Sequence, residues 1–187
     1  MARIFLVLAA AMLAIGCEKK QEAAGGAALA VAAGGGAPEQ GGTGALEEYK
    51  LKSMATEAVA SVRAMATGAK TYFSEDHVGP DGQLLKPGFP PSAPLTPPLG
   101  TCCERKEKTC APDPKLWEAA TWKALYFEVR DPFRYSYEFV SSEKGFTARA
   151  VGDLDCDGKT GTYEIQGTVG SSGDLTLGPL TKQNELE

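Results

Sequence analysis

Apolar side chains recur at helical spacing through the segment from Leu46 to Phe73. Seven of them are separated by 4, 3, 4, 3, 4 and 3 residues, and they are Leu51, Ala55, Ala58, Val62, Met65, Ala69 and Tyr72. This spacing places them on one stripe of an α-helix, while the charged residues between them face water. The pattern predicts one long amphipathic helix over residues 45–73, about 40 Å in length at 1.5 Å per residue.

Both ends of this predicted helix carry sequence signals. Glu47 and Glu48 are expected in its first turn, where the helix dipole favours negative charge. Gly79-Pro80 prevents the helix from continuing, because proline lacks a backbone N–H and its ring clashes with the preceding turn.

Alternating apolar and polar residues mark five short segments in the C-terminal third of the chain. Their apolar positions are Leu125, Phe127 and Val129 in the first, Tyr135, Tyr137 and Phe139 in the second, Phe146, Ala148 and Ala150 in the third, Tyr163 and Ile165 in the fourth, and Leu175 and Leu177 in the fifth. A period of two predicts strands with one buried face. Because the connections are short, neighbouring strands must be antiparallel. We expect a meander sheet of four to five strands within residues 123–180.

The residues between the helix and the sheet, 74–122, lack a hydrophobic period. Six prolines make residues 86–99 extended or polyproline-like, and we interpret this stretch as a covering loop rather than a ligand for a proline-recognising module. One helical turn is expected between Pro114 and Trp122, with Trp117 and Trp122 packed on the sheet. The predicted fold class is α+β, with one long helix packed on an antiparallel sheet and a proline-rich, cysteine-bearing loop between them.

The first seventeen residues are typical of an export signal. Arg3 precedes an apolar run from Ile4 to Ile15, which is too short to span a bilayer of about 30 Å but suits the centre of a secretory signal. Ala14-Ile15-Gly16-Cys17 resembles the lipobox of bacterial lipoproteins, which implies removal of residues 1–16 and acylation at Cys17. The alternative is an ordinary signal with a chance cysteine. Glu18 is not the residue that enteric bacteria use for inner-membrane retention, so we expect the outer membrane.

Residues 17–44 are rich in alanine and glycine and have no hydrophobic period. We expect them to form a flexible tether between the lipidated Cys17 and a single domain over residues 45–187.

The charge balance excludes two classes of partner. The chain has 19 basic and 24 acidic side chains, and removal of Arg3 with the signal leaves 18 basic ones and a net charge of −6. This acidity argues against nucleic-acid binding and against electrostatic attachment to anionic lipid. We therefore expect the acyl chains alone to anchor the protein in the membrane.

Four cysteines remain beyond Cys17, an even number that suits disulfides in an oxidising compartment. They are Cys102, Cys103, Cys110 and Cys156. Adjacent cysteines rarely pair with each other, so one of Cys102 and Cys103 is expected to pair with Cys110 and the other with Cys156. A zinc site is the alternative, but this spacing and the absence of a nearby histidine disfavour it.

The segment Asp153-Leu154-Asp155-Cys156-Asp157-Gly158 with Glu164 matches the spacing of an EF-hand calcium loop. Calcium prefers six to eight oxygen ligands. The expected ligands are the carboxylates of Asp153, Asp155, Asp157 and Glu164 and the backbone carbonyl of Lys159. The flanking residues are predicted strands rather than helices, so this would be an EF-like loop within a β-hairpin. The alternative is an acidic, solvated loop without an ion.

Little in the sequence indicates catalysis. His77 is the single histidine, and no serine or cysteine motif accompanies it as a nucleophile. We expect it to be a solvent-exposed loop residue, and we expect the protein not to be an enzyme.

The order of these features resembles the head of type IV pilins and pseudopilins. The residues that carry the resemblance are Ala69-Lys70-Thr71-Tyr72-Phe73 at the helix end, the cysteine cluster, the two tryptophans before the strands, Tyr135-Ser136-Tyr137 and Gly152-Asp153-Leu154-Asp155. The resemblance implies a structural or interaction role, and calcium would suit it. The chain departs from pilins because the export signal, Cys17 and the glycine-rich segment stand where pilins have an apolar half-helix.

Two functions are therefore expected. The first is a lipid-tethered, pilin-like module that docks on a pilus, a secretion system or another envelope protein. The alternative is a stand-alone, calcium-responsive lipoprotein that binds a ligand. An exposed apolar strip on the long helix would favour the first, and a concave pocket with convergent polar groups would favour the second.

Overall fold

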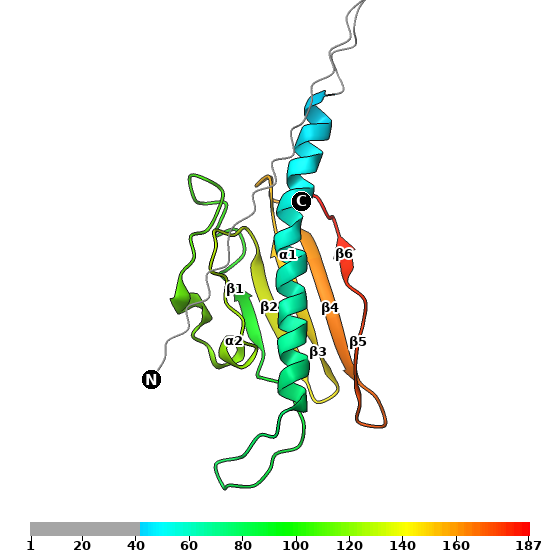
Figure 1. Ribbon diagram of the computed structural model, residues 1–187. Coiled ribbons are helices and arrows are strands. Elements are labelled where there is room, and N and C mark those ends of the chain that lie inside the picture. The colour runs from blue at the N-terminus through cyan, green and yellow to red at the C-terminus, as the bar shows by residue number, and fades with distance from the viewer. Residues whose placement is uncertain (1–41) are drawn as a thin grey trace, which may run out of the picture. The chain divides into compact units, whose positions relative to one another are not determined.

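The computed structural model describes residues 42–187, so the predicted signal (1–16), Cys17 and nearly all of the predicted tether lie outside the described residues. One long helix, α1 (Gly42–Ser74), lies against an antiparallel sheet (Figure 1). The strands are β1 (Ala93–Thr96), β2 (Ser136–Ser142), β3 (Gly145–Gly152), β4 (Gly161–Val169), β5 (Leu175–Leu177) and β6 (Thr181–Gln183). A 3-10 helix, η1 (Pro114–Trp117), and a short helix, α2 (Ala120–Ala124), precede β2. The predicted α+β class with one long helix and an antiparallel sheet is confirmed.

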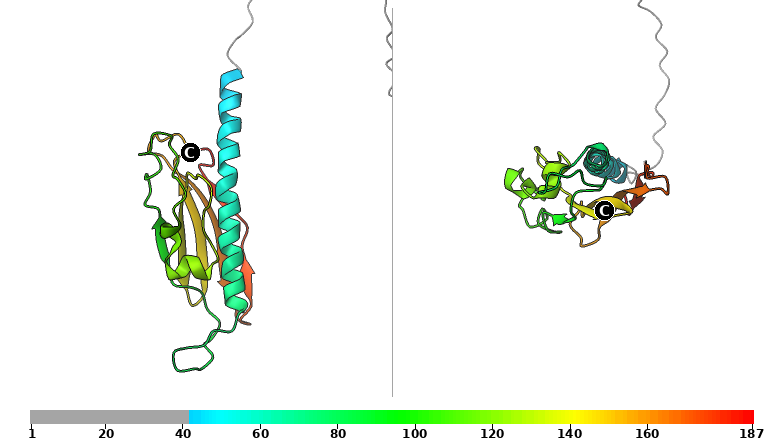
Figure 2. Two further views of the ribbon diagram at one scale, coloured as in Figure 1. Left: turned by 60° about the vertical axis from the view of Figure 1, so that its left-hand side comes forward. Right: turned by 90° about the horizontal axis from the view of Figure 1, so that it is seen from below.

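The apolar stripe of α1 forms one half of the core. Five of its seven predicted positions are buried, and these are Ala55, Ala58, Val62, Met65 and Ala69. The alanines are small, so α1 can approach a sheet face that carries large aromatic side chains. Those facing side chains include Tyr135, Tyr137, Phe139 and Tyr163, all fully buried. Figure 2 shows α1 running along this face, with its first turns extending past the sheet.

The sheet has the strand order β1-β2-β3-β4-β5, and β6 also pairs with β4. β5 pairs with residues 167–169 of β4 and β6 with residues 162–164, so the two short strands share one edge. Across the central strands, Tyr137 lies opposite Ala150 and Ala150 opposite Tyr163. These three residues lie on the buried face, where aromatic rings alternate with a small residue and fill the space evenly.

Four of the five predicted strands are present, but the one through Leu125, Phe127 and Val129 was wrong. α2 ends there in a Schellman motif, in which the Tyr126 N–H donates to the Lys123 carbonyl and the Phe127 N–H to the Trp122 carbonyl. Tyr126 has the left-handed φ of 52° that this motif requires. Leu125 and Phe127 are buried as predicted. The alternating pattern therefore predicted the burial of these side chains correctly but the type of secondary structure incorrectly.

Two strands were not predicted, and the sheet has six strands rather than four or five. β1 lies in the proline-rich segment that was interpreted as a covering loop, and it carries Pro94. An edge strand tolerates proline because one side of its backbone has no strand to bond. β6 has no buried residue, so it shows no hydrophobic alternation.

The predicted position of Glu47 and Glu48 in the first helical turn was also wrong. α1 begins at Gly42 and has no acidic residue in its first turn. The two glutamates instead form ion pairs with Lys50 at 2.8 Å and Lys52 at 2.6 Å. At three- and four-residue spacing these exposed pairs stabilise the helix by a few tenths of a kcal/mol each.

Close contact between α1 and the end of α2 depends on Gly68. A Cβ atom at this position would lie 2.2 Å from the Leu125 carbonyl oxygen, which is a steric clash with backbone. Gly68 therefore lets the α2 segment rest directly on α1, which fixes the position of Tyr126 and the residues around it.

Candidate functional site

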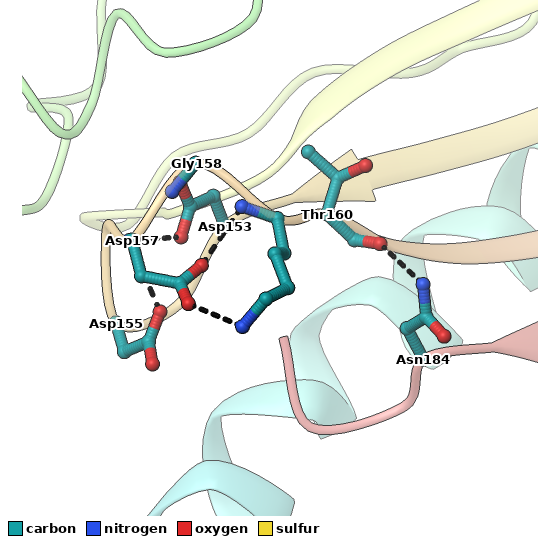
Figure 3. A network of polar contacts seen from close by, with 7 residues as sticks. Asp153, Asp155, Asp157, Gly158, Thr160 and Asn184 are labelled. Carbon is teal, nitrogen blue, oxygen red and sulfur yellow. Dashed lines mark hydrogen bonds and ion pairs between the residues drawn. The ribbon is translucent and has the colours of Figure 1, made fainter.

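The acidic loop between β3 and β4 brings together three of the predicted calcium ligands. One carboxylate oxygen from each of Asp153, Asp155 and Asp157 lies within 4.8 Å of the others. Figure 3 shows the three side chains converging on one side of the loop. Gly158 has a φ of 94°, so it makes the sharp turn that the sequence pattern predicted.

Backbone amides of the loop hold these carboxylates in place. Asp153 accepts hydrogen bonds from the N–H groups of Asp157 at 3.1 Å and Gly158 at 2.9 Å. Asp155 accepts a second, longer bond from the Asp157 N–H at 3.2 Å. The Asn184 side chain, just after β6, donates to the Thr160 carbonyl at 3.2 Å (Figure 3). The loop is therefore ordered by its own backbone and by the C-terminal segment.

The side chain and backbone N–H of Lys159 make contacts that the predicted ligand role of its backbone carbonyl does not include, and that carbonyl role stays a prediction. The ammonium of Lys159 lies 2.6 Å from the Asp157 carboxylate, and its N–H donates to the other oxygen of the same group at 2.8 Å. The hydrogen bond from Lys159 lowers the pKa of Asp157 below its ordinary value. Lys108, from the cysteine-bearing loop, donates to the Asp155 carbonyl at 2.7 Å. Two lysines thus offset part of the loop's negative charge, which the sequence pattern did not reveal.

Glu164 does not join the three aspartates. It lies on β4 opposite Arg149, whose Nε donates to its carboxylate at 2.9 Å. The same guanidinium donates to Glu138 of β2 at 3.1 Å, so Arg149 bridges two carboxylates across three strands. The second oxygen of Glu164 accepts from the Gln166 amide at 2.6 Å. The spacing matched an EF-hand, in which Glu164 would be position twelve. Here that position lies on a strand, which leads away from the loop, whereas a helix would bring its side chain back toward the aspartates.

Two disulfides complete this end of the molecule. Cys102 is bonded to Cys110 and Cys103 to Cys156, with Cα atoms 4.7 and 5.6 Å apart. The prediction that adjacent cysteines take different partners is confirmed, and the structure selects one of the two pairings that it left open. Because all four sulfurs are bonded, they offer no thiolate for zinc. The Cys103–Cys156 bond ties the acidic loop to the cysteine-bearing loop.

His77 is half-buried rather than exposed as predicted. Its ring stacks on Tyr72 with centroids 3.9 Å apart, and its Nε2 lies 2.8 Å from the Tyr72 carbonyl oxygen. These contacts give His77 a structural role at the start of the loop that follows α1.

Comparison with family models, with curated proteins and with solved structures finds no match to this chain. The resemblance to pilins therefore stays a prediction, as does the lipobox, which lies outside the described residues. Over residues 42–187, the helices contain no stretch with the length and hydrophobicity needed to cross a membrane.

Proposed function

We propose that this protein is a non-enzymatic, lipid-anchored component of the bacterial cell envelope, most simply of the outer membrane. Residues 45–187 would form a pilin-like head that docks on a pilus, secretion or surface assembly. Cys17 would carry the lipid and residues 17–44 would tether the head. The arrangement of one long helix, a disulfide-bonded loop and an antiparallel sheet supports the pilin-like interpretation, and the first seventeen residues support the anchor.

The observation that carries the docking role is the hairpin-like loop from His77 to Leu85. Val78 and Leu84 form an antiparallel bridge, and the Leu85 N–H donates to the His77 carbonyl at 2.7 Å. The Gly79 N–H donates to the Gln83 carbonyl at 2.8 Å. The loop after α1 projects beyond the sheet (Figures 1 and 2). It is an ordered projection.

This loop exposes three aliphatic side chains together. Val78 is 62% exposed, Leu84 69% and Leu85 54%. Grouped aliphatic side chains in water are unfavourable in a free protein and are typical of surfaces that bind another protein. The nearby exposed acids Asp76 and Asp81 disfavour insertion into anionic lipid. The partner that best complements this loop is a protein with an apolar surface and a basic rim.

A photo-reactive residue in the full chain tests this role. p-Benzoylphenylalanine in place of Leu84 is expected to give one discrete adduct with an envelope protein after irradiation of producing cells. The matched control places it at Val140, which is 46% exposed on β2, and should give background only. The adduct should disappear when Val78→Ser and Leu85→Ser are added. Equal adduct patterns at Leu84 and Val140 would count against the docking role.

A stand-alone, calcium-responsive lipoprotein remains the second candidate function. The cluster of Asp153, Asp155 and Asp157 supports calcium, with Glu164 omitted from the ligand set because its carboxylate is bound to Arg149. Calcium would have to displace the Lys159 ammonium from Asp157. This alternative predicts no stable protein adduct through Leu84 and a ligand response that depends on calcium.

A further inference from the structure

A hollow of about 430 Å³ opens beside η1 and α2, separate from the acidic loop and from the projecting loop. Its floor includes Trp117, Trp122 and Phe127, which are buried and contact one another. The Trp117 ring meets Trp122 and Phe127 edge-to-face, with centroids 5.6 and 5.4 Å apart. Their mutual packing makes the floor rigid, so that it needs no rearrangement when a ligand binds, and only small parts of the three rings reach solvent.

Tyr126 lines the same hollow and is not explained by the fold. It is 78% exposed, so its ring contributes little to the core. It occupies the position after the α2 cap, with a φ of 52°, where glycine is preferred because a Cβ atom is strained in the left-handed region. Glycine at this position would satisfy the Schellman motif at lower cost. An exposed phenol ring therefore stands where the local backbone favours glycine, beside an aromatic hollow.

The rim of the hollow carries both signs of charge in equal number. Glu118 and Glu128 supply two carboxylates, and Lys123 and Arg130 supply two cations. Arg130 and Glu128 form an ion pair. A ligand of one charge sign would be attracted by half of this rim and repelled by the other half. A neutral ligand with many hydroxyl groups can donate to the carboxylates and accept from the cations.

We propose that this hollow binds a sugar ring of a neutral oligosaccharide. A pyranose has one face of C–H groups and an edge of hydroxyls, which matches an aromatic surface with a rim of mixed charge. The C–H face would lie against Tyr126 and the hydroxyl edge would meet Glu118, Lys123 and Glu128. This activity does not depend on the proposed docking of the projecting loop.

Tryptophan fluorescence measures the site directly, because Trp117 and Trp122 are the two tryptophans of the chain. The probes are maltohexaose, cellohexaose and hexa-N-acetylchitohexaose, each titrated to millimolar concentration into the full chain carrying Cys17→Ser. At least one is expected to give a saturable change in emission. Tyr126→Ala should weaken that binding by about tenfold, the effect of losing one aromatic contact. Tyr49→Ala, at a tyrosine of α1 that is 71% exposed, should leave binding unchanged.

A second variant separates binding from folding. Tyr126→Gly should raise the melting temperature, because it relieves the left-handed backbone, and should still lose sugar binding. Two results would overturn the proposal: no saturable change with any of the three sugars, or equal affinity in the Tyr126→Ala variant. Neither of them bears on photo-crosslinking through Leu84, so failure of this proposal is distinguishable from failure of the docking role.

Discussion

The Tyr137 hydroxyl of β2 donates a hydrogen bond to the Glu57 carboxylate of α1 at 2.8 Å. Glu57 also accepts from the backbone N–H groups of Arg134 at 3.0 Å and Tyr135 at 3.3 Å. One carboxylate from the long helix thus satisfies the donors that lead into the first central strand. This contact joins the two halves of the fold at a polar point, where the Ser61 hydroxyl of α1 also donates to the Tyr137 hydroxyl at 3.3 Å.

Replacement of Glu57 by alanine should destabilise the domain by about 2–4 kcal/mol, because two backbone N–H groups and a phenol O–H would lose their partner. Urea denaturation of Glu57→Ala against the parent measures this change. Thr56→Ala is the matched control, since the Thr56 hydroxyl bonds only within the exposed face of α1. Equal losses of stability from the two substitutions would show that Glu57 does not stabilise the contact between helix and sheet.

Burial raises the pKa of Glu57 above its ordinary value of 4.5, although the hydrogen bonds from Arg134, Tyr137 and Tyr135 and the Arg134 charge oppose this effect. A carboxyl with a raised folded-state pKa stabilises the fold below its unfolded pKa, and this contribution is lost as pH rises through the folded pKa. Glu57→Gln removes the titration. It should therefore flatten the stability profile above pH 4.5 and equal or exceed the parent in stability at pH 7. If the stability of Glu57→Gln changed with pH above 4.5 in parallel with that of the parent, the raised pKa of Glu57 would be contradicted.

The two disulfides should differ in their contribution to stability. The Cys103–Cys156 bond spans 53 residues and the Cys102–Cys110 bond spans 8. By the entropy of loop closure, they contribute about 4 and 2.5 kcal/mol respectively. Denaturation of Cys103→Ser/Cys156→Ser and of Cys102→Ser/Cys110→Ser should show the larger loss for the first pair. Alkylation of the Cys17→Ser chain without reductant should label no cysteine, and two labelled cysteines would exclude the paired scheme.

Calcium should raise the melting temperature if the acidic loop binds it, because a ligand specific to the folded state stabilises that state. Asp153→Asn with Asp155→Asn should abolish the increase. Glu164→Gln should preserve it, since that carboxylate is bound to Arg149. Lys159→Gln should strengthen calcium binding, because it removes the ammonium that forms an ion pair with the Asp157 carboxylate. Melting curves that coincide in millimolar calcium and in chelator would leave an acidic turn without an ion.

Lipid anchoring is tested at Cys17. The parent should incorporate labelled palmitate and remain in the membrane fraction. The Cys17→Ser variant should incorporate no label, and it should either leave the membrane fraction or keep its signal peptide uncleaved. Palmitate in the Cys17→Ser protein would contradict the lipobox interpretation.

Hydrophobic patterns along the chain were sufficient to predict the elements that bury one face against a core. The stripe from Leu51 to Tyr72 predicted α1, and alternation predicted β2, β3 and β4, because burial imposes a periodic pattern on the side chains that it covers. Alternation also predicted β5, in which only Leu175 is partly buried. The rule that adjacent cysteines take different partners narrowed the disulfides to two pairings. β1 and β6 left no such pattern, since edge strands are held by backbone hydrogen bonds to which side chains contribute little.

Contacts between side chains of distant segments could not be read from these patterns, because they depend on how the segments pack in the folded chain. Leu125 and Phe127 alternate like strand residues, but their burial comes from the aromatic cluster of Trp117 and Trp122 and from the close approach at Gly68. Glu164 fits a calcium spacing, yet strand geometry carries it to Arg149. Spacing along a chain specifies a site only when the backbone between its residues is known, because the same number of residues spans different distances in a strand and in a helix.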